Sequence, residues 1–353
     1  MKSSVLSEFT QSIKSGTSLS TKEVSLAVQS LSAAGIKEEE KFSFLKSLAE
    51  KGETTEEFSA FVKGFRKLAS DPEIDDLMDG GIDLCGTGGD KSGSFNISSA
   101  VSFLLAAAGI PVIKHGNRSI TSKCGSADLI EASGIPLQMD KSLRRECLKR
   151  FNYCFLFAPA FHPAFKEIAP VRKSLATAGI VTIFNRLGPT LNPACPPYQL
   201  LGVYDAAYQQ EMANALSDNG GKGGWVVHGK IEGETGGIDE LTSCGDNLVL
   251  GYGTNQADRL SVLSPSAWDQ QIHSFSSLSG GDVKVNLKIL SALADGAVDE
   301  GLLATILINA AAALKITDQV DSLPEGVGLA RSMIQDGVLK KWLIEINDFF
   351  GSR

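Results

Sequence analysis

The residues from Asp83 to Ala100 combine the groups that a phosphate-binding site needs. An apolar strand over 81–85 runs into the glycine loop 86–90, and a helix is expected to open near Asn96 or Ser98. Glycine lets backbone N–H groups approach an anion closely, and the first turn of a helix adds unpaired N–H groups. The stretch fits neither the Walker loop nor the dinucleotide fingerprint. It predicts a phosphate cradle, with a tight turn that simply needs glycine as the plain alternative; four polar residues share its rim, Ser94, Asn96, Ser98 and Ser99.

A second polar cluster follows the next expected strand. The strand over 111–115 ends in Lys114, His115, Gly116, Asn117, Arg118 and Ser119, and the segment to Asp128 opens another helix. Lysine and arginine bind phosphate through charge-assisted hydrogen bonds. The pattern predicts a second anion site, and a solvated basic turn is the alternative.

The stretch 157–166 carries aromatic residues around His162, and Arg172 follows. This combination suits a flat ring that bears a carboxylate. A structural histidine and a water-facing arginine remain open as alternatives.

Asp239 and Glu240 lie in a glycine-rich loop after the strand that begins near residue 224. Mg²⁺ prefers a few carboxylates together with water and substrate phosphate oxygens. Beside two anion sites, this pair indicates a magnesium site.

Two kinds of element must position these residues. The pattern of residues 1–70 predicts amphipathic helices over 20–35, 37–49 and 56–68. Three short helices bury too little apolar surface to be stable alone, so they must pack on the rest of the chain or on a second subunit. After a linker at 71–80, strands and helices alternate, which predicts a largely parallel sheet that binds ligands at the carboxyl ends of its strands. The expected strands are 81–85, 111–115, 154–158, 180–183, 198–203, 224–228 and 247–250.

Composition narrows the class of protein. The 353 residues carry a net charge of −8 and a pI near 5.2, which argues against nucleic acid as a partner. Six cysteines without metal-site spacing indicate reduced thiols in the cytoplasm. No signal peptide is visible, and the apolar run 97–113 is too short and too interrupted to span a membrane, so it predicts a buried helix that leads into a strand.

Five motifs in order resemble the anthranilate phosphoribosyltransferases: GTGGD with FNIS, KHGNR with GSAD, FLFAP with HPA and PVR, TIFN-LGP-NP over 182–193, and GIDE. In the fourth motif Arg186 and Thr190 stand at variable positions. The resemblance implies an α/β fold with a small N-terminal helical domain, 1–75, and a large catalytic domain with a mostly parallel central sheet flanked by helices, 76–353. It also implies a homodimer formed through the helical part.

The implied reaction transfers the phosphoribosyl group of 5-phosphoribosyl 1-pyrophosphate to anthranilate, with Mg²⁺ as cofactor. Anthranilate would meet Gly86, Asn117, His162 and Arg172, and the catalytic residues would be Lys114, Asn117 and Arg172. Ser98, Asp239 and Glu240 would contact Mg²⁺. The phosphoribosyl pyrophosphate site would comprise Gly86, Gly89, Asp90, Ser94, Asn96, Ile97, Ser98, Ser99, Lys114, His115, Gly116, Asn117, Arg118, Ser119, Ser122 and Ser126.

The chain departs from the family pattern at Lys91, Cys124 and Val181, and in the lengthened turn 176–178. These departures concern acceptor specificity more than the reaction class. Two other functions share parts of the pattern. A pyrimidine nucleoside phosphorylase would not need the GIDE metal site, and a non-enzymatic paralogue that binds nucleic acid would have a decayed loop and a basic surface.

Overall fold

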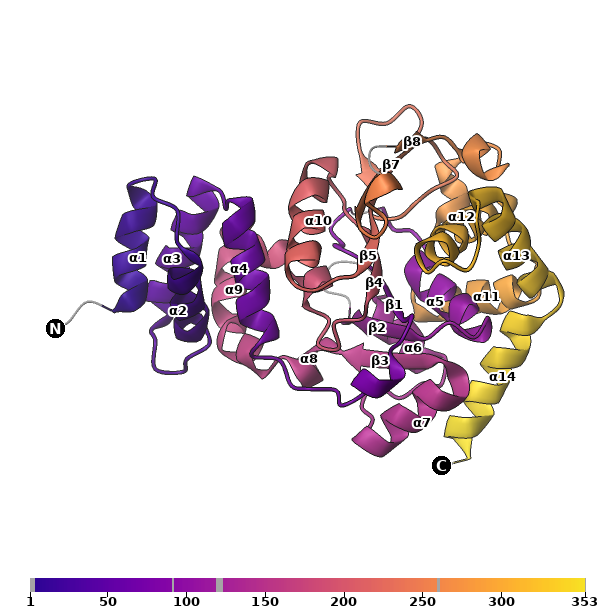
Figure 1. Cartoon of the computed structure of the whole chain (residues 1–353), viewed down its shortest axis with the longest axis horizontal. Coiled ribbons are helices and arrows are strands. Elements are labelled where there is room, and N and C mark those ends of the chain that lie inside the picture. The colour runs from indigo at the N-terminus through magenta and orange to yellow at the C-terminus, as the bar shows by residue number, and fades with distance from the viewer. Residues whose placement is uncertain (1–3, 91, 119–122, 259–260, 353) are drawn as a thin grey trace.

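The computed structural model describes residues 4–90, 92–118, 123–258 and 261–352. A group of helices at the N-terminal end lies beside a central sheet, and further helices cover the other side of that sheet (Figure 1). The predicted α/β class with a helical N-terminal part and a mostly parallel sheet is confirmed.

The first four helices form where the sequence provides both caps and apolar stripes. Ser20 and Thr54 each cap a helix through a reciprocal capping box, with Glu23 and Glu57 as the partners three residues later. Phe58, Phe61 and Phe65 are buried along one stripe of the fourth helix. The helices are α1 (Val5–Lys14), α2 (Thr21–Leu31), α3 (Glu38–Lys51) and α4 (Thr55–Arg66).

These helices share one apolar core with a later helix, α9 (Ala169–Thr177), and with one face of the sheet. Residues 176 and 177 lie in the last turn of α9, and Ala178 caps it. α9 packs against α3, and Figure 1 shows it within the N-terminal group of helices. The division of the chain at residue 75 stays a prediction, because this core joins residues from both sides of it.

The strands of the sheet lie in the order β3-β2-β1-β4-β5-β7-β8, with β6 paired to β5. The five strands from β3 to β5 run parallel, and β6, β7 and β8 pair antiparallel. The carboxyl ends of the five parallel strands therefore lie at the same edge of the sheet. The strands are β1 (Ile82–Gly86), β2 (Val112–Gly116), β3 (Tyr153–Phe157), β4 (Tyr198–Gly202), β5 (Gly223–Lys230), β6 (Gly237–Ile238), β7 (Asn247–Gly253) and β8 (Ser261–Leu263).

Alternate strand residues enter the two cores on opposite faces. In β5, Val226 packs with the N-terminal helices, whereas Trp225 and Val227 pack with the C-terminal ones. No helix among the described residues is both long enough and apolar enough to cross a bilayer. The remaining helices are α5 (Ile97–Ala107), α6 (Ser126–Ala132), α7 (Lys141–Phe151), α8 (Ala158–Phe161), α10 (Gln209–Asp218), α11 (Val283–Ala294), α12 (Glu300–Ile316), α13 (Leu323–Gln335) and α14 (Val338–Gly351).

The strand predicted over 180–183 is wrong. The segment leads into a 3₁₀ turn, η3 (Ile183–Asn185), which the amide nitrogen of Thr182 caps by donating to Asn185 Oδ1 at 2.9 Å. The place beside β1 is taken by β4, and Val181 is 57% exposed. Packing thus overrides the strand preference of a short β-branched run.

Candidate functional site

The glycine loop follows β1 and adopts conformations that require glycine. Gly88 and Gly89 have φ angles of +66° and +86°, which residues with a side chain rarely adopt. A Cβ on Gly86 would collide with the carboxylate of Asp239. The loop is therefore shaped by close contact with the GIDE segment, in which Asp239 lies 151 residues beyond Gly88.

The two GIDE carboxylates lie against the cradle formed by the loop and α5. The amide nitrogen of Gly88 donates to Asp239 Oδ2 at 2.7 Å, and that of Ser98 donates to Glu240 Oε1 at 3.0 Å. Burial raises the pKa of Glu240 to about 7. Burial and the neighbouring Asp90 and Glu240 raise the pKa of Asp239 well above its usual range.

This acidic cluster fits a cation. Lys114 is a buried positive group beside it, since its Nζ donates to the carbonyl of Leu84 and, at 3.2 Å, to Ser98 Oγ. Lys114 lowers the pKa of Glu240 but does not cancel the effect of burial. Within the described residues no three His, Cys, Asp or Glu side chains converge as a complete metal site. A cation here therefore needs oxygens from water or substrate, as Mg²⁺ commonly does.

Side chains of the cradle rim bind one another and neighbouring loops. Ser92 Oγ donates to Ser94 Oγ at 2.9 Å, and the amide nitrogen of Ser92 donates to Asp90 Oδ1 at 3.1 Å. Asn96 donates to the carbonyl of Cys124 at 3.1 Å and accepts from Asn286 Nδ2 at 2.8 Å. Asn286 belongs to α11 and was not predicted, because no local motif marks it.

The second predicted anion loop starts at the end of β2. Gly116 lies so close to Ser126 and Phe155 that a Cβ would collide with them. The carbonyl of Asn117 accepts from Ser126 Oγ at 3.3 Å, which ties this loop to α6. Arg118 forms ion pairs with Asp128 at 2.8 Å and Glu131 at 2.7 Å. Of the other predicted residues, Ser119 and Ser122 lie outside the described residues, as does the departure at Lys91.

A buried carboxylate under this loop was also missed by the sequence analysis. Asp83, in β1, accepts from the amide nitrogen of His115 at 3.2 Å and from Asn192 Nδ2 at 2.9 Å. Burial raises its pKa to about 6, although Lys114 acts in the opposite direction. The Asn192 of the NP motif thus links β1 to β2.

His162, which was predicted for the acceptor site, lies against His115, which was predicted for the donor site. The Nε2 atoms of His115 and His162 are 3.2 Å apart, and both rings are buried. Burial lowers the pKa of His162 to about 4 and that of His115 well below its usual range, so both rings are neutral at pH 7. Phe165 packs against His162, with ring centroids 5.7 Å apart.

Arg172 lies beside these rings. Its Cζ atom is 5.3 Å from the ring centroid of Phe184 and 6.0 Å from that of Phe165. Burial lowers its pKa, and no carboxylate of the described residues forms an ion pair with it. A guanidinium without an acidic partner between aromatic faces suits a planar carboxylate ligand.

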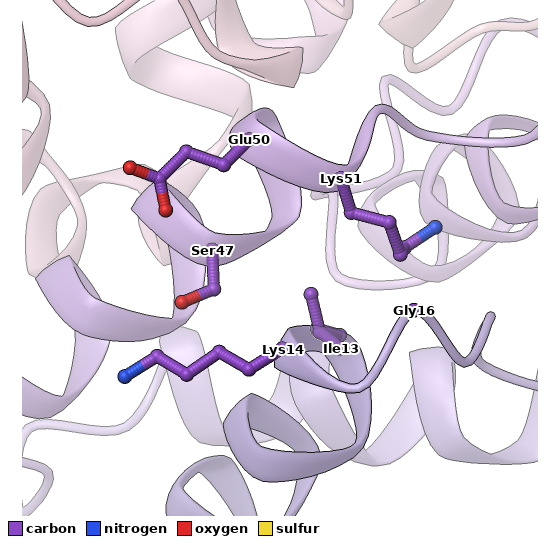
Figure 2. Close-up of a pocket in the computed structure, with 6 residues that line it drawn as sticks. All are labelled: Ile13, Lys14, Gly16, Ser47, Glu50 and Lys51. Carbon is purple, nitrogen blue, oxygen red and sulfur yellow. The ribbon is translucent and has the colours of Figure 1, made fainter.

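Two hollows lie away from this site. One, of about 500 Å³, is formed between α1 and α3 by residues that include Lys14, Ser47 and Glu50 (Figure 2). The other, of about 390 Å³, lies between α6, α11 and α14. Neither contains a residue of the predicted site.

Comparisons with known proteins agree with this arrangement. Residues 79–339 match the model of the glycosyl transferase family, a/b domain. The chain is 38% identical over 343 residues to the anthranilate phosphoribosyltransferase of Petrotoga mobilis, covering 97% of this chain and 96% of that protein. It is 40% identical over 294 residues to that of Chloroflexus aggregans, covering 83% of each.

Solved structures of anthranilate phosphoribosyltransferases have the same fold as this chain. The anthranilate phosphoribosyltransferase of Thermus thermophilus is 31% identical, has a TM-score of 0.84, and is matched over 97% of this chain and 99% of that chain. The Saccharomyces cerevisiae enzyme in complex with PRPP and Mg has a TM-score of 0.85 over 100% and 99% of the two chains; at 24% identity it supports the fold alone. The chain belongs to the anthranilate phosphoribosyltransferase family.

Proposed function

We propose that the chain transfers the phosphoribosyl group of 5-phosphoribosyl 1-pyrophosphate to anthranilate, which yields N-(5-phosphoribosyl)anthranilate and pyrophosphate. The observation that carries the proposal is the contact between the glycine loop and the GIDE carboxylates, at Gly88–Asp239 and Ser98–Glu240. It brings the groups for a phosphate and for its counter-ion into one place.

The donor site is proposed at the glycine loop, the start of α5 and the loop after β2. The backbone N–H group of Gly89 is suited to bind a phosphate oxygen, whereas those of Gly88 and Ser98 already donate to Asp239 and Glu240. Ser94, Asn96 and Ser99 would extend the site, and the second loop would cover the donor from Lys114 to Ser126.

Mg²⁺ is proposed to bind at Asp239 and Glu240 with Ser98, together with oxygens of the donor. When bound, it supplies positive charge that stabilises the leaving pyrophosphate. The yeast enzyme of the same fold was solved with PRPP and Mg, and magnesium is therefore the cation we propose. The raised pKa values of both carboxylates agree with a site that prefers a nearby cation.

Anthranilate is proposed to bind beside Arg172, with its carboxylate facing the guanidinium and its ring against Phe165 and Phe184. Gly86 ends β1 and Asn117 follows β2, so both lie at the edge where the carboxyl ends of the parallel strands meet, and there we propose that the amine reaches the donor.

The proposed chemistry is displacement at C1 of the sugar. Positive charge develops on the sugar ring as pyrophosphate departs, and the aromatic amine attacks from the opposite face. The amine is neutral at pH 7, so no strong base is required, and the two neutral histidines are consistent with that. Catalysis then depends on positioning by Asn117 and Arg172 and on charge stabilisation by Lys114.

A fluorescence assay tests the function. The purified protein should consume anthranilate when 5-phosphoribosyl 1-pyrophosphate and Mg²⁺ are both present, and should not when either is left out. An unchanged signal at micromolar enzyme would refute the proposal. Phosphorolysis of a pyrimidine nucleoside in the same preparation would favour the related phosphorylase instead.

We also propose that the protein is a cytoplasmic homodimer joined through its N-terminal helices. Val5 and Leu26 on α1 and α2 are 39% and 46% exposed, which is consistent with a partner surface. No disulfide joins any of the six cysteines, all of which lie in the described part of the chain, and this is consistent with a reducing compartment.

A further inference from the structure

Arg186 is a buried arginine outside the predicted site. It follows η3, is 7% exposed, and forms ion pairs with Glu53 at 2.9 Å and Glu211 at 3.3 Å. Glu53 precedes α4 and Glu211 belongs to α10, so the arginine joins three segments that are distant in sequence. Its guanidinium also lies 4.7 Å from the ring centroid of Tyr208.

A continuous path of contacts leads from Arg186 to the glycine loop. The ring centroids of Tyr208 and Tyr204 are 5.5 Å apart, and their hydroxyl oxygens are 3.5 Å apart. The amide nitrogen of Tyr204 donates to Thr87 Oγ1 at 3.1 Å. The ring of Tyr204 would lie 3.8 Å from a Cβ built on Gly89. The ring of Tyr204 therefore packs beside the glycine loop, and Arg186 contacts that ring indirectly, through Tyr208.

Stability alone is a weak reason for this arrangement. A buried ion pair is often no more stabilising than an apolar replacement, because both charges lose their hydration. Here Arg186 Nε is buried without a hydrogen-bond partner in the described structure, which adds a further cost. What the guanidinium offers is geometry, since its Nη2 donates to both carboxylates while its planar face lies over the ring of Tyr208.

We propose that Arg186 is a positioning residue for the phosphoribosyl pyrophosphate site, acting through Tyr208 and Tyr204 on the conformation of the glycine loop. The proposal rests on the proposed function, because it assigns the loop to that donor. It makes the affinity for the donor depend on a residue that does not touch it.

The test measures donor binding directly and turnover separately. Arg186→Leu alone would leave two buried carboxylates without a positive partner, so it is combined with Glu53→Gln and Glu211→Gln. We expect this triple variant to raise the Kd for 5-phosphoribosyl 1-pyrophosphate with Mg²⁺, measured by calorimetry, roughly tenfold. The KM for anthranilate should stay within about twofold, since the acceptor residues are not on the path.

Tyr204→Leu provides an independent variant on the same path, at a half-buried position. It should raise the same Kd by a similar factor, and combining it with the triple variant should add little, because both act on one element. Arg186→Lys should fall between the wild type and the triple variant, since it keeps the charge and loses the planar face that lies over Tyr208. Arg331→Leu in α13 is the control and should change neither constant.

Three outcomes would overturn the proposal. One is a triple variant with a lower Tm and wild-type Kd, which would make Arg186 a structural brace. Another is fully additive effects of the Arg186 and Tyr204 changes. The third is a wild-type protein that does not bind the donor, which would also remove the proposed function. A wild type that binds the donor and does not consume anthranilate would refute only the proposed function, and the Kd comparison would still decide the role of Arg186.

Discussion

Replacing Glu240 with glutamine should stabilise the unliganded protein at pH 8. Burial raises the pKa of this carboxyl from its ordinary value of 4.5 to about 7, so the folded protein holds a proton that the unfolded chain releases. Stability on this account is greatest below pH 4.5 and falls as the pH rises to about 7. Glutamine removes the ionised form and keeps an oxygen that can accept from the amide nitrogen of Ser98.

The size of the effect follows from the pKa. A rise from 4.5 to about 7 costs about 3 kcal/mol at 1.36 kcal/mol per pH unit, and some solvent contact keeps the real cost at or below this value. At roughly 2.1 cal/mol/K per residue, the unfolding entropy of 353 residues is about 0.7 kcal/mol/K, so Tm should rise by up to about 4 °C at pH 8. At pH 4.5 the variant and the wild type should coincide.

Thermal unfolding from pH 4.5 to pH 8.5 measures this difference. Glu234→Gln is the matched control, because Glu234 is an exposed acid in the preceding loop. Mg²⁺ with pyrophosphate should raise the Tm of the wild type at pH 8 more than that of Glu240→Gln. A variant that is less stable at pH 8, or that is equally stabilised at both ends of the range, would show that burial of Glu240 is not costly.

Three further predictions concern the two substrate sites and the oligomer. Arg172→Ala should raise the KM for anthranilate by about one to two decades, through loss of a charge-assisted pair, and leave donor binding unchanged. Lys173→Ala, at an exposed position, is its control. An effect on donor binding alone would show that Arg172 belongs to the phosphate site. Gly89→Ala should abolish donor binding in calorimetry while the fold persists, because φ is +86° there; Gly328→Ala, in an open helical position, should change nothing. Light scattering should give twice 37.4 kDa, and a monomer would contradict the proposed dimer.

The fold could be predicted largely because its signals are local and repeated. The parallel strands contain short apolar runs, and several helices begin after a capping side chain, as at Ser20, Thr54 and Asp140. The exception at residues 180–183 is instructive, because a run of β-branched residues says nothing about whether a place in the sheet is free. The place beside β1 was already taken by β4, which lies further along the chain.

The candidate site was predictable only where residues form a motif. The sequence marks the glycine loop and the GIDE pair, but not which backbone N–H each carboxylate accepts. No sequence motif identifies Asn286 as part of the site, since its role depends on a hydrogen bond to Asn96, which is 190 residues away in the chain. The ion pairs of Arg118 could have been predicted from the sequence. Asp128 and Glu131 are three residues apart on α6, so their side chains share a face of the helix that Arg118 can approach.

Charge balance shows how an acidic protein could bind a pyrophosphate. The loop after β2 was predicted as an anion site because it holds Lys114, His115 and Arg118. In the structure His115 is neutral at pH 7, Arg118 is paired with two carboxylates, and Lys114 lies among Asp83, Glu240 and Ser98. These three residues therefore leave little free positive charge for a bare polyanion. A site of this kind favours a donor that carries its own cation, because the magnesium complex supplies the charge that Asp239 and Glu240 require and is less negative than the free pyrophosphate.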